Sequence, residues 1–313
     1  MSTTTTTTTE DQPHASELVP LLHTGLDVRQ ACRSEKHTSV TAGLAPGHLQ
    51  ANLIVLPSRY ARDFRLLCTR NPVPCPLLAE STSPGCFDRL RSRIPSVADD
   101  AWVGPSPSNF DIRRDLPRYN VYRDGALVAA GVTDIVSEWK SDHVGFLIGC
   151  SFSFETALAA AGLAPRHVLL GGKNVAMYRT TIPLCAAGVF AGATYVVSMR
   201  PYPAREVERV RSVTRGFVAT HGEPVDWGWE AVARLGIEDI DGPDWGDAVT
   251  DVNGRLLGES WGSEEDVPVF WGCGVTPQEA VMRAKGLQGT VMAHAPGHML
   301  VLDAKDGDIR MPT

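Results

Sequence analysis

Two segments far apart in the chain share one plan, and this plan restricts the fold more than any other feature of the sequence. Residues 144–158 read VGFLIGCSFSFETAL and residues 267–281 read VPVFWGCGVTPQEAV. Each begins with an apolar run typical of a buried strand, passes through Gly-Cys and a short turn, and enters a segment with helical spacing. Because strands alternate with helices in this way, the sequence predicts an α/β fold, broadly mixed α+β, with helices packed on mixed sheets.

Other segments supply the remaining elements. Further strands are predicted at 52–56, 194–198 and 299–302, and further helices at 60–68 and 204–219. In addition, the sequence predicts a hairpin that turns at Asp124-Gly125, a rigid proline-rich loop at 71–76, and an exposed Ser/Pro/Gly-rich excursion at 79–110.

The chain of 313 residues shows no clean linker, and its motifs are scattered along most of its length. Residues 1–20 contain a run of threonines and are predicted to be a disordered tail. We therefore expect residues 21–313 to form one interwoven domain with a smaller subdomain.

Composition narrows the class of protein. The net charge of −7 argues against nucleic acid or an anionic membrane as the main partner. Seven widely spaced cysteines, without a secretory segment or a long apolar run, predict a cytoplasmic protein with reduced thiols. No C-x-x-C pair, dinucleotide fingerprint, P-loop or G-x-S-x-G elbow occurs, so neither a structural metal nor a cofactor is expected.

The two Gly-Cys turns are the first candidates for chemistry. They place Cys150 and Ser151, with Ser153 nearby, at one predicted helix start and Cys273 and Gly274 at another. Free backbone amides and the helix dipole suit an anion there and can lower the pKa of a cysteine. Residues Thr276, Pro277 and Glu279 resemble a capping box at the second helix start. The alternative is a plain turn with a small buried thiol.

Charged residues near these turns extend the candidate site. Glu155 lies one turn after Ser151 and is a candidate general base, or else a surface acid that complements the helix start. Arg200 follows a predicted buried strand, where it could bind a carboxylate or form a structural ion pair. Asn174, Tyr178 and Arg179 are expected in a loop that contributes to substrate binding.

Histidines complete the list of candidates. His294 and His298 flank a Pro-Gly pair that forbids a regular helix, so they do not form a helical metal site. One of them could act as an acid or orient the substrate, and the alternative is a buried, hydrogen-bonded histidine. His221 and Asp226 lie together in a further loop and are also candidates for substrate binding.

Taken together, these motifs closely resemble the D-glutamate cyclase-like hydro-lyase family. The resemblance covers about residues 25–305 and rests on these strings, in this order: TAGLAPGHLQANLIVLP, NPVPCPLL, DIRRDLPRY, FLIGCSFSFE, NVAMYRT, VVSMRP, VPVFWGCGVTPQ and HAPGHMLVLD. It implies a lyase that removes water from a small carboxylic acid. One relative of this family is a D-glutamate cyclase, which makes 5-oxo-D-proline.

One loop departs from the family pattern. The family usually reads His-Gly-Ala/Ser-Pro-Val-His followed by Gly-Asp, whereas this chain reads HGEPVDWGW from His221. Asp226 replaces the second histidine, Trp229 replaces an acid and Glu223 replaces a small residue. If this loop lines the pocket, the change implies a specialised paralogue that acts on an amino or hydroxy acid other than D-glutamate.

The resulting hypothesis is loss of water by cyclisation or elimination from a small carboxylate-bearing substrate. Arg200 and Arg179 would hold carboxylates, and Glu155 and His294 would act as base and acid with support from His298. Cys150 or Cys273 could instead form a thioester. Two alternative hypotheses are a small-molecule-binding protein without turnover and a metal-assisted lyase. A homodimer is the default expectation.

Overall fold

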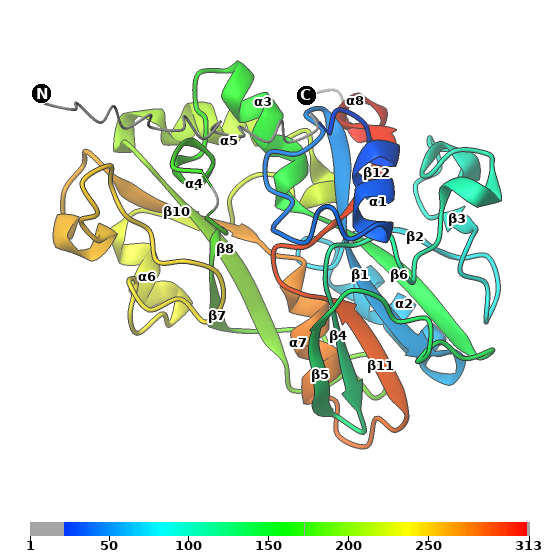
Figure 1. Ribbon diagram of the computed structural model, residues 1–313. Helices are drawn as coiled ribbons and strands as arrows, with labels where there is room; N and C mark the ends of the chain where they lie inside the picture. Colours follow the sequence, from blue (N-terminus) through cyan, green and yellow to red (C-terminus); the bar gives the residue numbers. More distant parts are fainter. Residues whose placement is uncertain (1–21, 172, 312–313) are drawn as a thin grey trace, which may run out of the picture.

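The computed structural model describes residues 22–171 and 173–311, so the predicted tail at 1–20 lies outside the described residues. The chain forms two sheets that lie side by side (Figure 1). The large sheet has the order β3-β2-β6-β1-β11-β4-β5, and β12 also pairs with β1. Its strands are β1 (His48–Pro57), β2 (Leu77–Ser81), β3 (Leu90–Ser92), β4 (Tyr119–Arg123), β5 (Ala126–Val132), β6 (His143–Gly149), β11 (Thr290–His294) and β12 (Leu300–Lys305).

The small sheet has the order β7-β8-β10-β9. Its strands are β7 (Ala176–Pro183), β8 (Thr194–Tyr202), β9 (Asp226–Trp227) and β10 (Val267–Gly272). The predicted α+β class is confirmed. The expected mixed sheets are refined, because all ladders between described strands are antiparallel.

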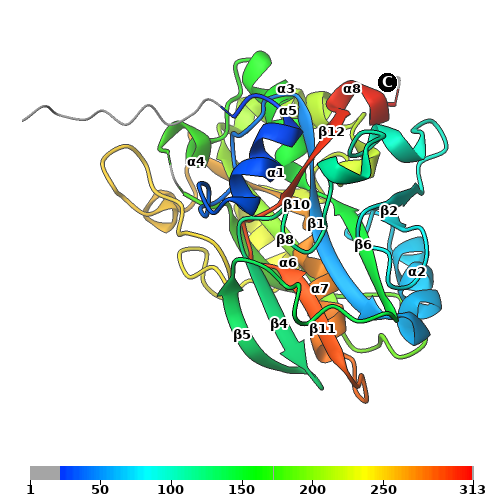
Figure 2. The same cartoon turned by 45° about the vertical axis from the view of Figure 1, so that its right-hand side comes forward.

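Helices cover the sheets and connect them. They are α1 (Gly25–Arg33), α2 (Ala61–Arg70), α3 (Glu155–Ala160), α4 (Arg166–Leu169), α5 (Val207–Thr214), α6 (Trp229–Leu235), α7 (Val275–Arg283) and α8 (Asp306–Ile309). Figure 2 shows α1 lying along β12. Helix α7 contacts both β8 and β1, so it links the small sheet to the large one.

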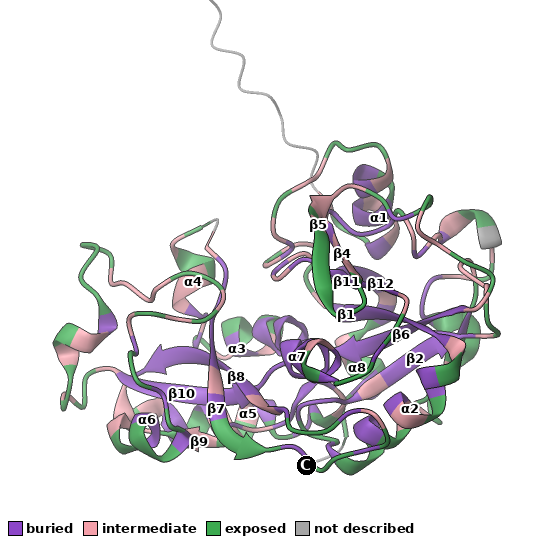
Figure 3. Ribbon diagram, turned by 90° about the horizontal axis from the view of Figure 1, so that it is seen from below, coloured by how far each residue is buried: buried purple, intermediate pink, exposed green. Residues whose placement is uncertain are grey.

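Strand β1 lies in the middle of the large sheet, and a hydrophobic cluster packs on each of its two faces. All ten of its residues are buried. Leu53 and Val55 contribute to one hydrophobic cluster, and Ile54 and Leu56 contribute to a second. Figure 3 shows β1, β6 and β10 as buried strands. A strand with cores on both faces reads as a continuous apolar run, which is why the sequence identified it.

The predicted hairpin is confirmed. Strands β4 and β5 pair across Asp124 and Gly125, whose φ angles are +50° and +83°. Two positive φ angles match the twist of a two-residue hairpin turn, and Asp-Gly is a favoured pair for it.

Three expectations about local structure are wrong. Segment 79–110 is not simply an exposed excursion, because it contains most of β2 and β3 and buries Trp102 and Phe110 in the core. Tyr178 and Arg179 lie on strand β7 rather than in a loop. Arg200 lies inside β8 rather than after it. In each case tertiary contacts decided the structure where the local composition was ambiguous.

The helix predicted at 204–219 is shorter in the structure. A 3₁₀ turn at Ala204–Glu206 precedes α5, which ends at Thr214. Within the described residues, no helix combines the length and the apolar character that a membrane crossing requires.

Gly149, at the end of β6, provides a test of this packing. A Cβ atom there would lie 2.0 Å from the carbonyl oxygen of Ala219, a backbone atom that cannot rotate away. We expect Gly149→Ala to lower the free energy of unfolding by about 1–3 kcal/mol, the usual cost of overpacking. Urea unfolding measures this. Gly307→Ala is the control because a Cβ there meets nothing within 4 Å, and equal stability of the two variants would contradict the packing.

Candidate functional site

The two Gly-Cys turns meet where the sheets adjoin. Cys150 follows β6 of the large sheet, Cys273 follows β10 of the small sheet, and both belong to one buried cluster. We call this the seam cluster, and its members are Cys150, Phe152, Val175, Met177, Val196, Cys273, Val275 and Met299. The structure therefore brings together two turns that are more than a hundred residues apart in sequence, as the sequence hypothesis required.

The chemistry expected of the two thiols differs from what the structure shows. Burial raises the pKa of the Cys273 thiol to about 11, and burial also raises the pKa of the Cys150 thiol. The expectation of a lowered pKa is therefore wrong. Both thiols are neutral at ordinary pH, and a neutral thiol is a poor nucleophile.

The second turn also lacks the predicted capping box. Helix α7 begins at Val275, and the Thr276 hydroxyl instead donates to the carbonyl of Val196, at 3.1 Å. Gly274 is required because the side-chain amide of Asn52 packs against its Cα, where a Cβ would lie 1.8 Å from the amide nitrogen. The close approach at this glycine is thus made by the protein itself.

A buried ion pair lies next to the first turn. The Arg200 Nε donates to Glu155 Oε1 at 2.9 Å, and a second guanidinium nitrogen also contacts this oxygen. The Arg200 side chain is fully buried, and the same guanidinium donates to the hydroxyls of Ser151 and Ser198, at 3.0 and 3.2 Å. It also lies over the rings of Phe154 and Trp271, 5.2 and 5.4 Å from their centroids.

This environment fixes the charge of Glu155. Burial alone would raise the pKa of its carboxyl group, but the charges of Arg200 and His167 outweigh burial and hold the pKa below its ordinary value. Glu155 is therefore an ionised carboxylate. Its Oε1 is occupied by Arg200, whereas its Oε2 is buried and has no partner among the described residues.

His167 is a candidate that the sequence analysis missed. It lies on α4, and its Nε2 is 3.2 Å from Glu155 Oε1, although out of line for a hydrogen bond. Its ring stacks on Phe152 with the centroids 6.1 Å apart. No sequence signal pointed to it, because a single histidine after a proline is common and its carboxylate partner lies in a different helix.

Two cavities lie on either side of this stacked pair. One has a volume of about 170 Å³, and Gln50, Phe152 and Glu155 are among the residues that line it. The other is a recess of about 20 Å³, lined in part by His167, Lys173 and Asn174. Gln50 Oε1 and Asn174 Oδ1 are buried and, like Glu155 Oε2, have no partner among the described residues. Unsatisfied buried polar atoms beside cavities are expected of a binding site.

The remaining candidates on the small sheet have structural contacts. The Tyr178 hydroxyl donates to the carbonyl of Ile240 at 2.6 Å and is buried. Arg179 pairs with Glu279 and Asp244, and its guanidinium lies 4.3 Å from the centroid of the Trp245 ring. Ser153 on the first turn binds the backbone of Gln50. Neither Arg179 nor Arg200 is without a carboxylate partner, so neither is ready to hold a substrate carboxylate.

His294 occupies a fork in the large sheet. Ile54 of β1 pairs with β11, whereas Ala51 pairs with β12, and Leu53 lies between these two pairings. The His294 Nδ1 lies 3.2 Å from both the backbone nitrogen and the backbone oxygen of Leu53. Its side chain is fully buried, so this position resembles the structural alternative more than that of an acid catalyst. His298, in contrast, is half-buried.

Comparisons with known proteins agree with the motifs. The family model described as D-glutamate cyclase matches residues 144–303. A protein of Rubrobacter xylanophilus named "Putative hydro-lyase" is 46% identical over 282 residues, which are 90% of this chain and 96% of that protein. The chain belongs to the D-glutamate cyclase family.

Other members of the D-glutamate cyclase family show the same extent of similarity. "Putative hydro-lyase YcsI" of Bacillus subtilis is 45% identical and covers 90% of this chain and 96% of its own. A "Putative hydro-lyase" of Schizosaccharomyces pombe is 42% identical over 278 residues, which are 89% of this chain and 83% of that protein. The predicted family and the assignment to hydro-lyases are confirmed.

Solved structures were matched as well. A nitrogen repressor-like protein of Methanococcus jannaschii covers 87% of this chain and 96% of its own, with a TM-score of 0.32 and 9% identity. This similarity is too low to inform the fold or the function.

The loop that departs from the D-glutamate cyclase family pattern lies away from both cavities. Asp226 pairs with Arg234, and Glu223 pairs with Arg211 and Arg215, all near the outer edge of the small sheet. Asp226 therefore does not join Arg200 and Glu155 in the structure. Glu223, Asp226 and Trp229 are not among the residues that line either cavity.

Only His221 of this loop is directed inward. It is buried, its backbone has a φ angle of +87°, and its Nδ1 lies 2.8 Å from the carbonyl oxygen of Val73. Its Nε2 has no partner among the described residues. A histidine in the left-handed region is held there by its surroundings. Across residues 22–171 and 173–311, no group of three or more His, Cys, Asp or Glu residues could hold a metal ion.

The two buried histidines predict a dependence of stability on pH. Burial lowers the pKa of both His221 and His294 to about 4, from an ordinary value of 6.5. Between these values the unfolded chain binds protons that the folded chain does not. The stabilisation is therefore complete above pH 6.5 and is lost as pH falls toward 4, by up to about 1.4 kcal/mol per pH unit for each histidine.

Urea unfolding of the wild type and of His294→Asn at several pH values measures this slope. The variant should show a shallower dependence between pH 6.5 and 4.5 even if it is less stable at pH 7. Identical slopes for the two proteins would show that His294 does not contribute to the pH dependence of the free energy of unfolding.

Proposed function

We propose that this chain removes water from a small amino- or hydroxy-carboxylic acid bound at the seam between the sheets, beside Glu155 and His167. The observation that carries the proposal is the arrangement of Glu155. Its carboxylate is ionised and fixed by Arg200 through one oxygen, and its other oxygen is unsatisfied beside a cavity of about 170 Å³.

The charge of Glu155 decides which group transfers the proton. A carboxylate whose pKa is held below its ordinary value is a weak base, so Glu155 is better suited to accept a hydrogen bond from a substrate ammonium or hydroxyl. The Nε2 of His167 lies 3.2 Å from Oε1 of this carboxylate, and histidine is the side chain best suited to transfer protons near neutral pH. We therefore assign proton transfer to His167, the orientation of His167 and substrate to Glu155, and the positioning of Glu155 to Arg200.

This arrangement suits both routes of water loss. In elimination, the neutral imidazole of His167 takes a proton from the carbon beside the carboxylate and returns it to the hydroxyl on the neighbouring carbon, so that the C–O bond breaks, a C=C bond forms and water leaves. In cyclisation, the neutral amine attacks the protonated carboxyl group of the same substrate and gives a proton to this imidazole, and the resulting imidazolium protonates the hydroxyl that leaves as water. Both routes need a group beside the leaving oxygen that can take up and return a proton, and His167 lies next to Glu155, on the wall of the smaller recess.

D-Glutamate is the first compound to test. The sequence argument against it was the altered loop at 221–229, and this loop lies at the outer edge of the small sheet. Family membership therefore has more weight than the loop in choosing a substrate. Other small amino and hydroxy acids form the rest of the panel.

The thioester route is the less favoured alternative, because burial keeps both thiols neutral. We expect Cys150→Ser and Cys273→Ser each to retain turnover within about threefold of the wild type. Steady-state kinetics measure this, with thermal unfolding as a check on folding. Loss of turnover beyond 100-fold in a stable variant would instead support a covalent intermediate.

His167→Gln is the direct test of the proposed function. We expect the wild type to convert one member of the panel with the mass loss of one water, and we expect the variant to lose about 10²–10⁴-fold in kcat. Glu155→Gln should lose activity as well, but it leaves Arg200 without a carboxylate and so also lowers stability.

Glu230→Gln, which changes an exposed carboxylate on α6, is the matched control and should keep full activity. Thermal stabilisation by a panel member without any product in the wild type would contradict the lyase and support a binding protein. Full activity of His167→Gln would contradict the assignment of proton transfer.

A further inference from the structure

Arg118 is a half-buried arginine without an acidic partner. Its Nη1 donates to the carbonyl oxygen of Gly131 at 3.0 Å, and its Nε donates to that of Thr38 at 3.4 Å. No ion pair joins it to a carboxylate within the described part of the chain. Charged groups that are withdrawn from water are normally paired, so this residue is an exception that needs a physical reason.

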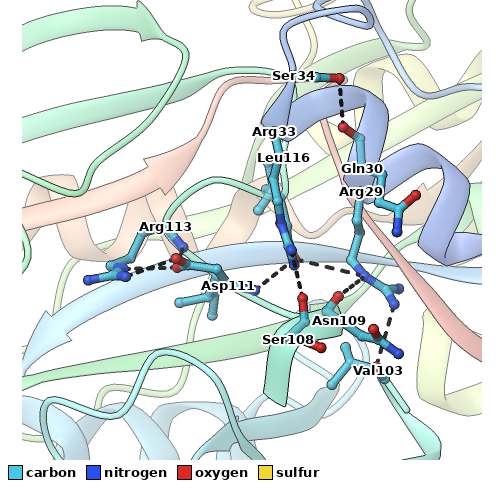
Figure 4. A network of polar contacts seen from close by, with 12 residues as sticks. Arg29, Gln30, Arg33, Ser34, Val103, Ser108, Asn109, Asp111, Arg113 and Leu116 are labelled. Carbon is cyan, nitrogen blue, oxygen red and sulfur yellow. Dashed lines mark hydrogen bonds and ion pairs between the residues drawn. The ribbon is translucent and has the colours of Figure 1, made fainter. Parts of the chain in front are cut away.

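Three other charged residues of the same motif hold the loop in place. Asp111 pairs with Arg113, and the buried Asp115 accepts hydrogen bonds from Arg33. Figure 4 shows Arg29 and Arg33 of α1 converging on this segment, beside the pair of Asp111 and Arg113. The charges of the DIRRDLPRY motif therefore fall into three groups: Asp111, Arg113 and Asp115 fix the loop, Arg114 is exposed, and Arg118 is half-buried without an acidic partner.

Two histidines face Arg118. The backbone of Arg118 accepts a hydrogen bond from Ala295, which brings the 294–299 loop beside it, and the bond to Thr38 brings His37 beside it. The Nδ1 of His298 lies 2.9 Å from the Pro296 carbonyl, and the Nε2 of His37 lies 3.3 Å from the Val40 carbonyl. Burial, and then the charge of Arg118, lowers the pKa of His298.

This basic cluster of Arg118, His37 and His298 lies at the seam. Gly297, next to His298, packs so closely on Asn174 that a Cβ would be 2.6 Å from its amide nitrogen. Met299 belongs to the seam cluster with Cys150 and Cys273. From His37 the chain continues to Gly43–Pro46, which line the cavity beside Glu155. The cluster is thus connected by a short loop to the proposed reaction site.

Arg118 is a half-buried cation in a chain with a net charge of −7, and its guanidinium contacts two neutral backbone carbonyls instead of an acid. Elsewhere the chain pairs its partly or fully buried arginines with Asp or Glu, as at Arg33, Arg166 and Arg200. An oxyanion bound beside the two histidines would supply the missing charge partner of Arg118, and a planar guanidinium matches a carboxylate in particular.

We infer that Arg118, His37 and His298 bind a carboxylate of the substrate, at the end remote from the group that loses water. That the bound carboxylate belongs to a substrate rests on the proposed function, but carboxylate binding itself can be tested without turnover. It assigns the carboxylate-holding role to Arg118 in place of Arg200 and Arg179, which are already paired with acids.

Malonate binding is the test, with malonamide as the uncharged probe of matched shape. Titration calorimetry at constant ionic strength should show that the wild type binds malonate and does not bind malonamide. We expect Arg118→Gln to weaken malonate binding at least tenfold, His298→Asn to weaken it several-fold, and Arg118→Lys to retain more affinity than Arg118→Gln.

Arg114→Gln is the matched control, because Arg114 belongs to the same motif but is exposed. Thermal unfolding without ligand verifies that each variant is folded, and Arg118→Lys keeps the test valid if Arg118→Gln unfolds. Unchanged malonate affinity in a folded Arg118→Gln, no malonate binding to the wild type, or equal loss in Arg114→Gln would overturn the inference. Tighter binding of phosphate than of malonate would overturn the assignment to a carboxylate.

His167→Gln separates the two proposals. It should bind malonate like the wild type while losing turnover. If it loses neither, the proposed function fails and the carboxylate site stands. If turnover depends on His167 but malonate binding does not depend on Arg118, the carboxylate site fails and the proposed function stands.

Discussion

The buried pair of Arg200 and Glu155 is the interaction on which the arrangement at the seam depends. Arg200 comes from β8 of the small sheet, and Glu155 begins α3, which follows β6 of the large sheet. The pair therefore joins the two sheets at the level of the cavity. Removing one partner would leave a charge buried without compensation, which is far more destabilising than replacing both. The position of Glu155 is fixed by this constraint.

The two sheets are held in register by a second set of contacts. Helix α7 packs on β8 and on β1, and Asn52 of β1 packs against Gly274 at the start of this helix. His294 fills the place where β1 changes its partner from β11 to β12. These contacts explain why all of the FWGCG motif and most of the HAPGH motif are buried, since many of their residues join the sheets.

The polar groups that the two proposals assign to the substrate lie around this framework. His167 and the free oxygen of Glu155 are on one side of the seam, and Arg118 with His37 and His298 is on another. A substrate with a carboxylate at one end and a leaving oxygen at the other has complementary chemistry. Polar atoms beside the two cavities, such as Glu155 Oε2 and Asn174 Oδ1, have no partner among the described residues, which is what the proposed binding of a ligand there requires.

The sequence by itself determined the local elements and the family. Apolar runs identified β1, β6, β8 and β10, Asp-Gly identified the hairpin, and the motifs identified the hydro-lyases. It also singled out Glu155, Arg200 and the two cysteines, which do come together. These predictions succeed because strand and turn preferences depend on residues that are adjacent in the chain.

Only the tertiary structure decided which of these groups are free to act. It paired Arg200 with Glu155, 45 residues away, and Arg179 with Glu279, 100 residues away. In the structure His167 lies beside Glu155, and Arg118 has no acidic partner among the described residues. The divergent loop lies at the outer edge of the small sheet. Charge partners and burial depend on contacts between distant segments, and these set the pKa of a group and its access to a ligand. No local pattern in the sequence contains that information.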